Sequence, residues 1–217
     1  MSESPQQLPR TLWVGIVFLI VMLVLAYLAS LVRLEQKHPR LPVLGGIAPF
    51  TLTNQNDQAT TLADLANHVW VADIIFTRCA GPCPRMTQQM ASLQAVLPKD
   101  GPARLVTLTT DPDFDTPAVM RKYGERFGAD FNRWTFLTGT KGEIAGLAGD
   151  SLKLSAVPVK PEDRKDSADL FIHSTIFVVV DKHAQLRAVF ETGGDGAEWT
   201  NVQPHIVAAV RHLENEP

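Results

Sequence analysis

The feature that most constrains this chain is its pair of cysteines, Cys79 and Cys83, the only two among 217 residues. An apolar run from Val69 to Phe76 leads into the pair and is typical of a strand buried on both faces. The run from Arg85 to Leu97 follows it with helical spacing of apolar residues. Two thiols at a strand-to-helix junction can hold a soft metal, cycle as a disulfide, or do both.

Strands and helices alternate on both sides of this junction. The other expected elements, in chain order, are strands at 50–53, 104–109 and 134–137, helices at 115–127 and 140–147, a hairpin of 174–180 and 185–190, and a closing helix at 198–213. This order predicts an α/β sandwich with a mixed central sheet, and a thioredoxin-like fold fits it. The charged, proline-containing segment 150–169 is expected to be an exposed, mobile loop.

The N-terminal segment predicts a single transmembrane helix. The 22 residues from Thr11 to Val32 carry no charge, and at about 1.5 Å per residue they span the ~30 Å core of a bilayer. A cleavable signal would have a shorter apolar core and a small-x-small exit, whereas Tyr27 or Leu28 occupies the upstream small position here. We therefore expect an uncleaved anchor. The predicted organisation is a tail at 1–10, the anchor at 11–33, a tether at 34–46 and a thioredoxin-like domain at 47–217.

Charge restricts the partners and leaves the orientation open. Arg10 is the only base before the apolar run, and Arg33, Lys37 and Arg40 follow it, so a simple count keeps the domain in the cytoplasm. Long domains cross membranes largely regardless of such charges. The net charge of −3, with Lys and Arg scattered, gives no basic stripe, so nucleic acid is not an expected partner.

The spacing of the cysteines suits a metal or redox site. It places Cys79 before the helix and Cys83 near its first turn, where backbone N–H groups and the helix dipole favour the thiolate. Arg78 and Arg85 would act in the same direction. Thiolates suit Cu(I) or Zn(II), and two of them leave either metal short of its usual three or four donors. A histidine from elsewhere is the natural supplement.

Among the six histidines, His173 stands out because it precedes the apolar strand at 174–180, at the end of the charged loop. Position alone leaves a ligand role and an ordinary strand-end role equally open. The other five are expected to be solvated or capping side chains: His38, His68, His183, His205 and His212.

Three further kinds of side chain could contribute to the site. Asp111 follows a strand and could bond to the site, approach the metal, or act only as a turn residue before a proline. Met86 and Met90 could be sulfur donors, but their helical spacing on an apolar face favours core packing. The tryptophans are expected to be core or rim anchors: Trp70, Trp134 and Trp199.

Three segments, in order, resemble the Sco/SenC family of membrane-anchored, thioredoxin-like copper proteins, which help assemble the binuclear copper centre of haem–copper oxidases. Residues 76–84 match the family's CxxxCP motif. Residues 109–117 match its second block, with Tyr123, Phe127, Trp134 and 137–139 beyond it. Residues 169–175 match the block that supplies a metal-binding histidine. The resemblance covers roughly residues 50–213.

This resemblance implies that Cys79, Cys83 and His173 are ligands of copper, as Cu(I) or Cu(II). It also implies an inner-membrane protein whose domain is exported to the periplasmic side. The implied partners are the copper-centre subunit of a haem–copper oxidase, other copper carriers and thiol reductants. The chain departs from the commonest family pattern at 80–82 and at 171–172, and neither departure removes a ligand.

Two functions from different classes follow from these residues. The first is a copper metallochaperone for oxidase assembly. The second is a membrane-anchored thiol–disulfide oxidoreductase that uses Cys79 and Cys83 to reduce a copper-site or other exported client. A peroxide-reducing enzyme of the same fold fits less well, because such enzymes generally have a different cysteine context. His173 separates the first two, since a copper site needs it and a reductase does not.

Overall fold

The computed structural model describes residues 10–37, 40–154, 156–158, 171–173, 175–193 and 198–216, and it describes side chains at 12–28, 40–154, 175–193 and 198–216. The chain forms two compact units, Met1–Arg40 and Leu41–Pro217. The second unit includes the segment before residue 47, because strand β1 (Gly45–Gly46) pairs with β10 and the Leu44 N–H donates to the Leu186 carbonyl at 2.8 Å.

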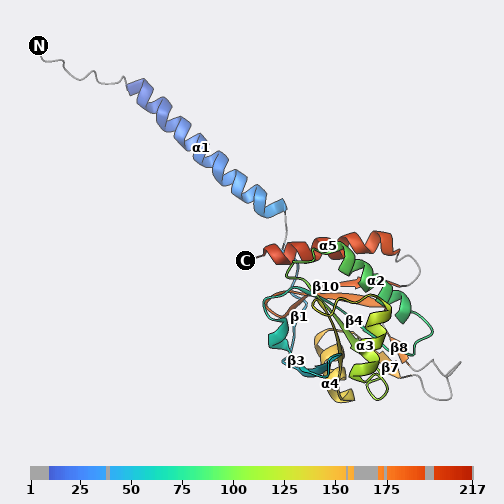
Figure 1. Ribbon diagram of the computed structural model, residues 1–217. Helices are drawn as coiled ribbons and strands as arrows, with labels where there is room; N and C mark the ends of the chain where they lie inside the picture. The colour runs from blue at the N-terminus through green and yellow to red at the C-terminus, as the bar shows by residue number, and fades with distance from the viewer. Residues whose placement is uncertain are drawn as a thin grey trace, which may run out of the picture. The chain divides into compact units, whose positions relative to one another are not determined.

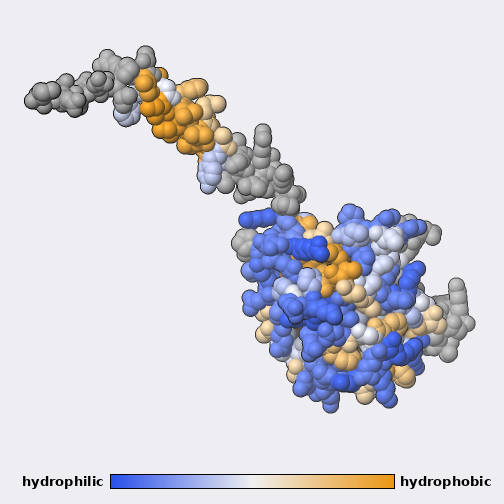
Figure 2. Space-filling model, turned by 45° about the horizontal axis from the view of Figure 1, so that its top comes forward, coloured by the Kyte–Doolittle hydropathy of each residue, from blue (hydrophilic) through white to orange (hydrophobic). Residues whose placement is uncertain are grey.

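The first unit contains one long helix, α1, which spans Arg10–Lys37. Its large apolar side chains between Leu12 and Leu28 are exposed, and Figure 2 shows them as a continuous apolar surface in orange. Within the residues described, no helix combines the length and the apolar character needed to cross a bilayer. The predicted membrane span at 11–33 is therefore not confirmed.

The second unit is built on an eight-stranded mixed sheet with the order β1-β10-β9-β4-β5-β6-β2-β3. Its other strands are β2 (Thr51–Asn54), β3 (Ala59–Thr61), β4 (Trp70–Ile75), β5 (Arg104–Thr109), β6 (Trp134–Thr138), β9 (Ile176–Val180) and β10 (Gln185–Glu191). Strands β4, β5 and β6 are parallel, and every other pairing is antiparallel. The predicted mixed sheet is confirmed, including the hairpin of β9 and β10.

Helices cover both faces of this sheet. They are the 3-10 turn η1 (Leu62–Leu65), α2 (Cys83–Val96), α3 (Pro117–Arg126), α4 (Lys141–Ala145), the π-helical turn η2 (Gly146–Ser151) and α5 (Trp199–Asn215). Helices α2, α3 and α5 pack on one face, where α2 and α5 lie side by side (Figure 1), and η1, α4 and η2 pack on the other. Strand β4 is buried on both faces because Val71 and Ile75 point into the first core, while Ala72 and Ile74 point into the second. This is a thioredoxin-like sandwich.

The expected exposed loop at 150–169 is corrected over the part that the structure describes. Asp150 and Ser151 belong to η2, and Leu152 and Leu154 are buried in the second core. Residues Ala156–Pro158 then form β7, which pairs with β8 (Phe171–His173) in a separate two-stranded sheet. The charged residues at 160–166 motivated the prediction and lie outside the described residues, whereas the leucines before them pack as apolar side chains normally do.

Candidate functional site

The two cysteines lie at the carboxyl end of β4, as predicted. Cys79 follows the strand in a loop and is half-buried, while Cys83 is the first residue of α2 and is fully buried. Both are thiols rather than a disulfide. A side-chain hydrogen bond joins Cys79 and Cys83, and the Gly81 N–H donates to the Cys79 sulfur at 3.3 Å. The loop therefore brings the two sulfur atoms together.

The protonation of Cys83 differs from the sequence-based expectation. Its hydrogen bond with Cys79 raises the pKa of the Cys83 thiol, and burial adds to the rise. A backbone hydrogen bond with Phe76 opposes them, but the pKa of Cys83 stays far above the ordinary thiol value. Helix position alone therefore does not make Cys83 a thiolate, because desolvation acts against the charged form. A metal that binds here would have to displace the proton.

His173 is placed at the same end of the sheet by topology. Strand β9 runs antiparallel to β4, with Ala72 opposite Val178 and Trp70 opposite Val180. The start of β9 therefore lies beside the end of β4, where Cys79 follows. His173 ends β8, a few residues before β9, with Ala156 as its partner in β7. Its side chain is outside the described part, and among the described residues no group of three His, Cys, Asp or Glu side chains could hold a metal.

Asp111 contacts an arginine. Its carboxylate pairs with the Arg78 guanidinium at 2.5 Å, and that guanidinium lies 4.1 Å from the centre of the Phe114 ring. The Asp111 carbonyl also accepts the N–H groups of Phe114 and Asp115, which is the expected turn. Arg78 thus balances this carboxylate beside the thiol loop. Of the three roles open for Asp111, the turn and the hydrogen bond near the site are present, and an approach to the metal stays a prediction.

Asp115 binds the thiol loop to the segment after β5. Its carboxylate, fully buried, accepts hydrogen bonds from the Thr77 N–H at 3.1 Å, the Thr77 hydroxyl and the Thr109 hydroxyl at 2.5 Å. Burial raises the pKa of Asp115, while these bonds oppose the rise. The sequence suggested only that 115–117 opens a helix, and Thr116 does cap α3. Asp115 instead points back to Thr77, two residues before Cys79.

An Asp115→Ala substitution is expected to lower the free energy of unfolding by roughly 2–4 kcal/mol. Three donors would lose their acceptor, and each unsatisfied buried group costs about 1–3 kcal/mol, partly recovered by local rearrangement. Urea unfolding measures the change. Asp113→Ala is the matched control, because Asp113 is exposed and pairs with the equally exposed Lys141. It should stay within about 0.5 kcal/mol of the parent, and an equal loss for both variants would contradict the Asp115 assignment.

Sequence reasoning also missed a second buried carboxyl near the thiols. Asp73 lies in β4, is fully buried, and accepts a hydrogen bond from the Thr107 hydroxyl at 2.7 Å. Its charge adds to the rise in the pKa of Cys83. The sequence could have revealed this residue, since Asp73 is the only charged residue in the apolar run 69–76.

The methionines, the tryptophans and the other described histidines have the structural roles expected of them. Met86 and Met90 are fully buried in the core, as are Trp70 and Trp134, and Trp199 donates to the Ser92 hydroxyl at 2.9 Å. The His68 ring bonds to the Pro102 carbonyl at 2.8 Å. His183 and His205 are exposed, His212 on α5 is paired with Glu216 just after that helix, and His38 lies outside the described residues.

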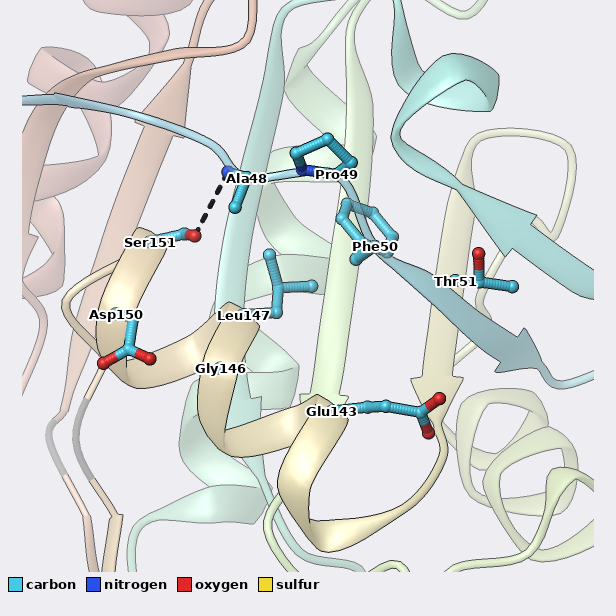
Figure 3. A pocket seen from close by; sticks show the side chains of 9 residues that line it. All are labelled: Ala48, Pro49, Phe50, Thr51, Glu143, Gly146, Leu147, Asp150 and Ser151. Carbon is cyan, nitrogen blue, oxygen red and sulfur yellow. Dashed lines mark hydrogen bonds between the residues drawn. The ribbon is translucent and has the colours of Figure 1, made fainter.

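A pocket lies away from this chemistry. It measures about 510 Å³ and is formed where residues 48–51 pass α4 and η2. Figure 3 shows Phe50 near Leu147, the carboxylates of Glu143 and Asp150 at opposite ends of the helical segment, and the Ser151 hydroxyl accepting from the Ala48 N–H. Neither cysteine lines it. Glu143 already accepts hydrogen bonds from Thr140 in a capping box.

Fold and site together define a class: a thioredoxin-like domain with a CxxxC thiol pair between a central strand and the helix that follows it. Comparison with known proteins makes the class specific. The SCO1/SenC family model matches residues 44–207, and this chain belongs to the SCO1/SenC family.

Individual relatives agree with this assignment. The SCO1 protein homolog of Bacillus subtilis is 36% identical over 136 residues, which cover 62% of this chain and 67% of that protein. A protein of Stutzerimonas stutzeri described as copper-binding is 28% identical over 149 residues, with 68% of this chain and 70% of that protein covered. The solved structure of BsSco, a member of the Sco family of cytochrome c oxidase assembly proteins in which a disulfide switch was identified, aligns with a TM-score of 0.67 and 30% identity. That alignment covers 82% of this chain and 99% of BsSco.

Proposed function

We propose that this protein binds copper through Cys79, Cys83 and His173 and delivers it to the copper-centre subunit of a haem–copper respiratory oxidase. The observation that carries the proposal is the pair of free thiols at the end of β4, with Cys79 in the loop and Cys83 at the start of α2, both packed against the same core. Two soft donors fit copper, which is the cargo here. Related proteins support both copper binding and a role in oxidase assembly, since one relative is described as copper-binding and BsSco belongs to a family of cytochrome c oxidase assembly proteins.

The topology of the sheet supports His173 as the third ligand. Two thiolates leave Cu(I) or Cu(II) short of donors. The antiparallel pairing of β9 with β4 leads the chain past the thiols just after His173. The imidazole would come from β8, whereas the thiols lie in the loop after β4 and in α2. A movement that separates these elements would therefore open the donor set and release copper.

We expect His173→Ala to weaken Cu(I) binding by about 100-fold or more, because loss of even an outer partner of a ligand costs about 10–100-fold. The Cys79–Cys83 reduction potential should change by about 30 mV or less, since it depends on thiolate stabilisation and loop strain. Chelator competition and redox titration measure the two quantities. His183→Ala, in an exposed hairpin turn, is the control. Full oxidase activity in cells with His173→Ala at limiting copper would favour the reductase function.

A second function, thiol–disulfide exchange, is favoured by the unequal burial of the thiols. Cys79 is the accessible sulfur and Cys83 the buried one. The Cys79 thiolate would attack a client disulfide and release one client thiol. Cys83 would then attack the Cys79 sulfur, release the second client thiol and leave a Cys79–Cys83 disulfide. Such a reaction would prepare the cysteines of a copper site before copper is loaded, so the two functions are compatible.

We also propose that α1 anchors the protein in the inner membrane as a single-pass helix, with the domain on the periplasmic side. The uncharged run of 22 residues and the exposed apolar side chains of α1 support this, because a helix that is apolar all round is normally buried in protein or lipid. Fusions after Pro217 to alkaline phosphatase and to a fluorescent protein that matures in the cytoplasm test the orientation. Active phosphatase with a dark fluorescent protein is expected, and the reverse pattern would place the domain in the cytoplasm.

A further inference from the structure

A buried hydrogen-bonded bridge joins the helix that carries Cys83 to the chain that follows His173. Gln89 lies on α2, six residues after Cys83, and its side-chain N–H donates to the Thr192 carbonyl at 3.0 Å. Gln89 and Thr192 are only 6% and 1% exposed. The amide therefore links α2 to the segment after β10 in the protein interior, on the face of the sheet that carries the thiols.

The same segment is bonded to Thr175, which lies between His173 and β9. The Thr192 N–H and hydroxyl both donate to the Thr175 carbonyl, at 2.7 and 2.9 Å. The Thr175 hydroxyl donates to the Gly193 carbonyl at 2.6 Å. Three bonds thus fix Thr175, two residues after His173, to the residues that Gln89 holds.

Gly193 shows how closely these parts approach one another. A Cβ at Gly193 would lie 2.5 Å from an Arg85 guanidinium nitrogen and 2.9 Å from the Thr175 Cβ. Side chains from α2 and from the residue before β9 therefore both approach the Gly193 backbone, and a Cβ there would force them to shift. This packing supports the bridge independently of the hydrogen bonds.

We propose that Gln89 is a positioning residue for the copper site: through Thr192 and Thr175 it sets the distance between His173 and the thiols on α2. The inference rests on the proposed ligand set, because it assigns Gln89 an effect on copper only through His173. The other amide atom of Gln89, Oε1, is buried and has no hydrogen-bond partner among the described residues. An apolar residue of similar size therefore removes the bridge and leaves no unsatisfied Gln89 group behind.

The test uses the full chain in detergent with Cu(I) as the probe. Gln89→Leu is compared with Gln88→Leu, an exposed glutamine on the preceding position of α2, and Gln89→Met repeats the change with an unbranched side chain. We expect both Gln89 variants to bind Cu(I) about 10-fold more weakly, at the lower end of the effect of outer-shell residues, and to alter the spectrum of bound Cu(II). The Gln88 variant and the Cys79–Cys83 reduction potential should not change.

A double-mutant cycle with His173→Ala makes the result specific. If Gln89 acts through His173, Gln89→Leu has no further effect once His173 is gone. An equal loss of affinity in both backgrounds, or parental affinity of Gln89→Leu where His173→Ala binds weakly, would overturn the positioning role alone. Parental affinity of His173→Ala would instead overturn the proposed ligand set, and the positioning role with it.

Discussion

Substitution of Cys83 by Ser is expected to abolish tight Cu(I) binding, with an affinity loss well beyond the roughly 10–100-fold that follows the loss of an outer-shell partner. Serine replaces a soft sulfur with a hard oxygen. The remaining set of one thiolate and one imidazole falls short of what the metal requires. Cys83 is fully buried in the first turn of α2, so no side chain from solvent can take its place without opening the core.

Competition against a Cu(I) chelator measures this loss, with Cys79→Ser expected to behave in the same way. Met86→Leu is the matched control, because it removes a buried sulfur one turn along α2 while nearly conserving volume, which usually costs less than about 1.5 kcal/mol. It should bind one copper per chain. Stoichiometric copper on Cys83→Ser, or loss of copper from Met86→Leu, would show that the ligand set is wrong.

Substitution of Arg187 by Met should have the largest effect on stability, about 3–5 kcal/mol, as expected when a buried ion pair loses one partner. Arg187 is 6% exposed, and its guanidinium bonds to Asp181 at 2.6 Å and to Glu216 at 2.9 Å. It also donates to the carbonyls of Leu41 and Pro42, at 2.6 and 3.3 Å. The substitution would leave the Asp181 carboxylate buried without its cation and release both ends of the domain.

Urea unfolding tests the effect. Arg121→Met is the control, because the Arg121–Glu125 pair is exposed and such pairs contribute about 0–1 kcal/mol. Adding Asp181→Asn to Arg187→Met should recover part of the loss if the buried charge is its cause. Equal losses for the Arg187 and Arg121 variants would mean that the buried pair contributes no more than the exposed one.

Sequence reasoning was most accurate where a structural element is determined by neighbouring residues. The strand–thiol–helix junction, the Met86 and Met90 stripe of α2, the hairpin of β9 and β10 and the helix that opens at 115–117 all depend on residues close together in the sequence. Each of these is confirmed.

Features that depend on distant partners could not be predicted in the same way. Gln89 and Thr192 are separated by 103 positions, and Arg187 and Leu41 by 146. A glutamine on a helix and an arginine on a strand show no periodic signal that reveals such partners. The pKa of Cys83 belongs to this group only in part, because the neighbouring Cys79 is the largest cause of its rise and burial, which the whole core determines, adds to it.

The position of β9 beside β4 has a consequence for the chain during its synthesis. Ribosomes make proteins from the N-terminus, and pairings between distant segments form late because their loop-closure entropy must be overcome first. Strand β4 and both thiols are therefore synthesised about a hundred residues before the strand that covers one edge of β4. Until that strand arrives, Cys83 has no complete core around it and is open to the oxidants that attack accessible cysteines. Newly made chains should thus depend on a reductant during synthesis more than finished chains do afterwards.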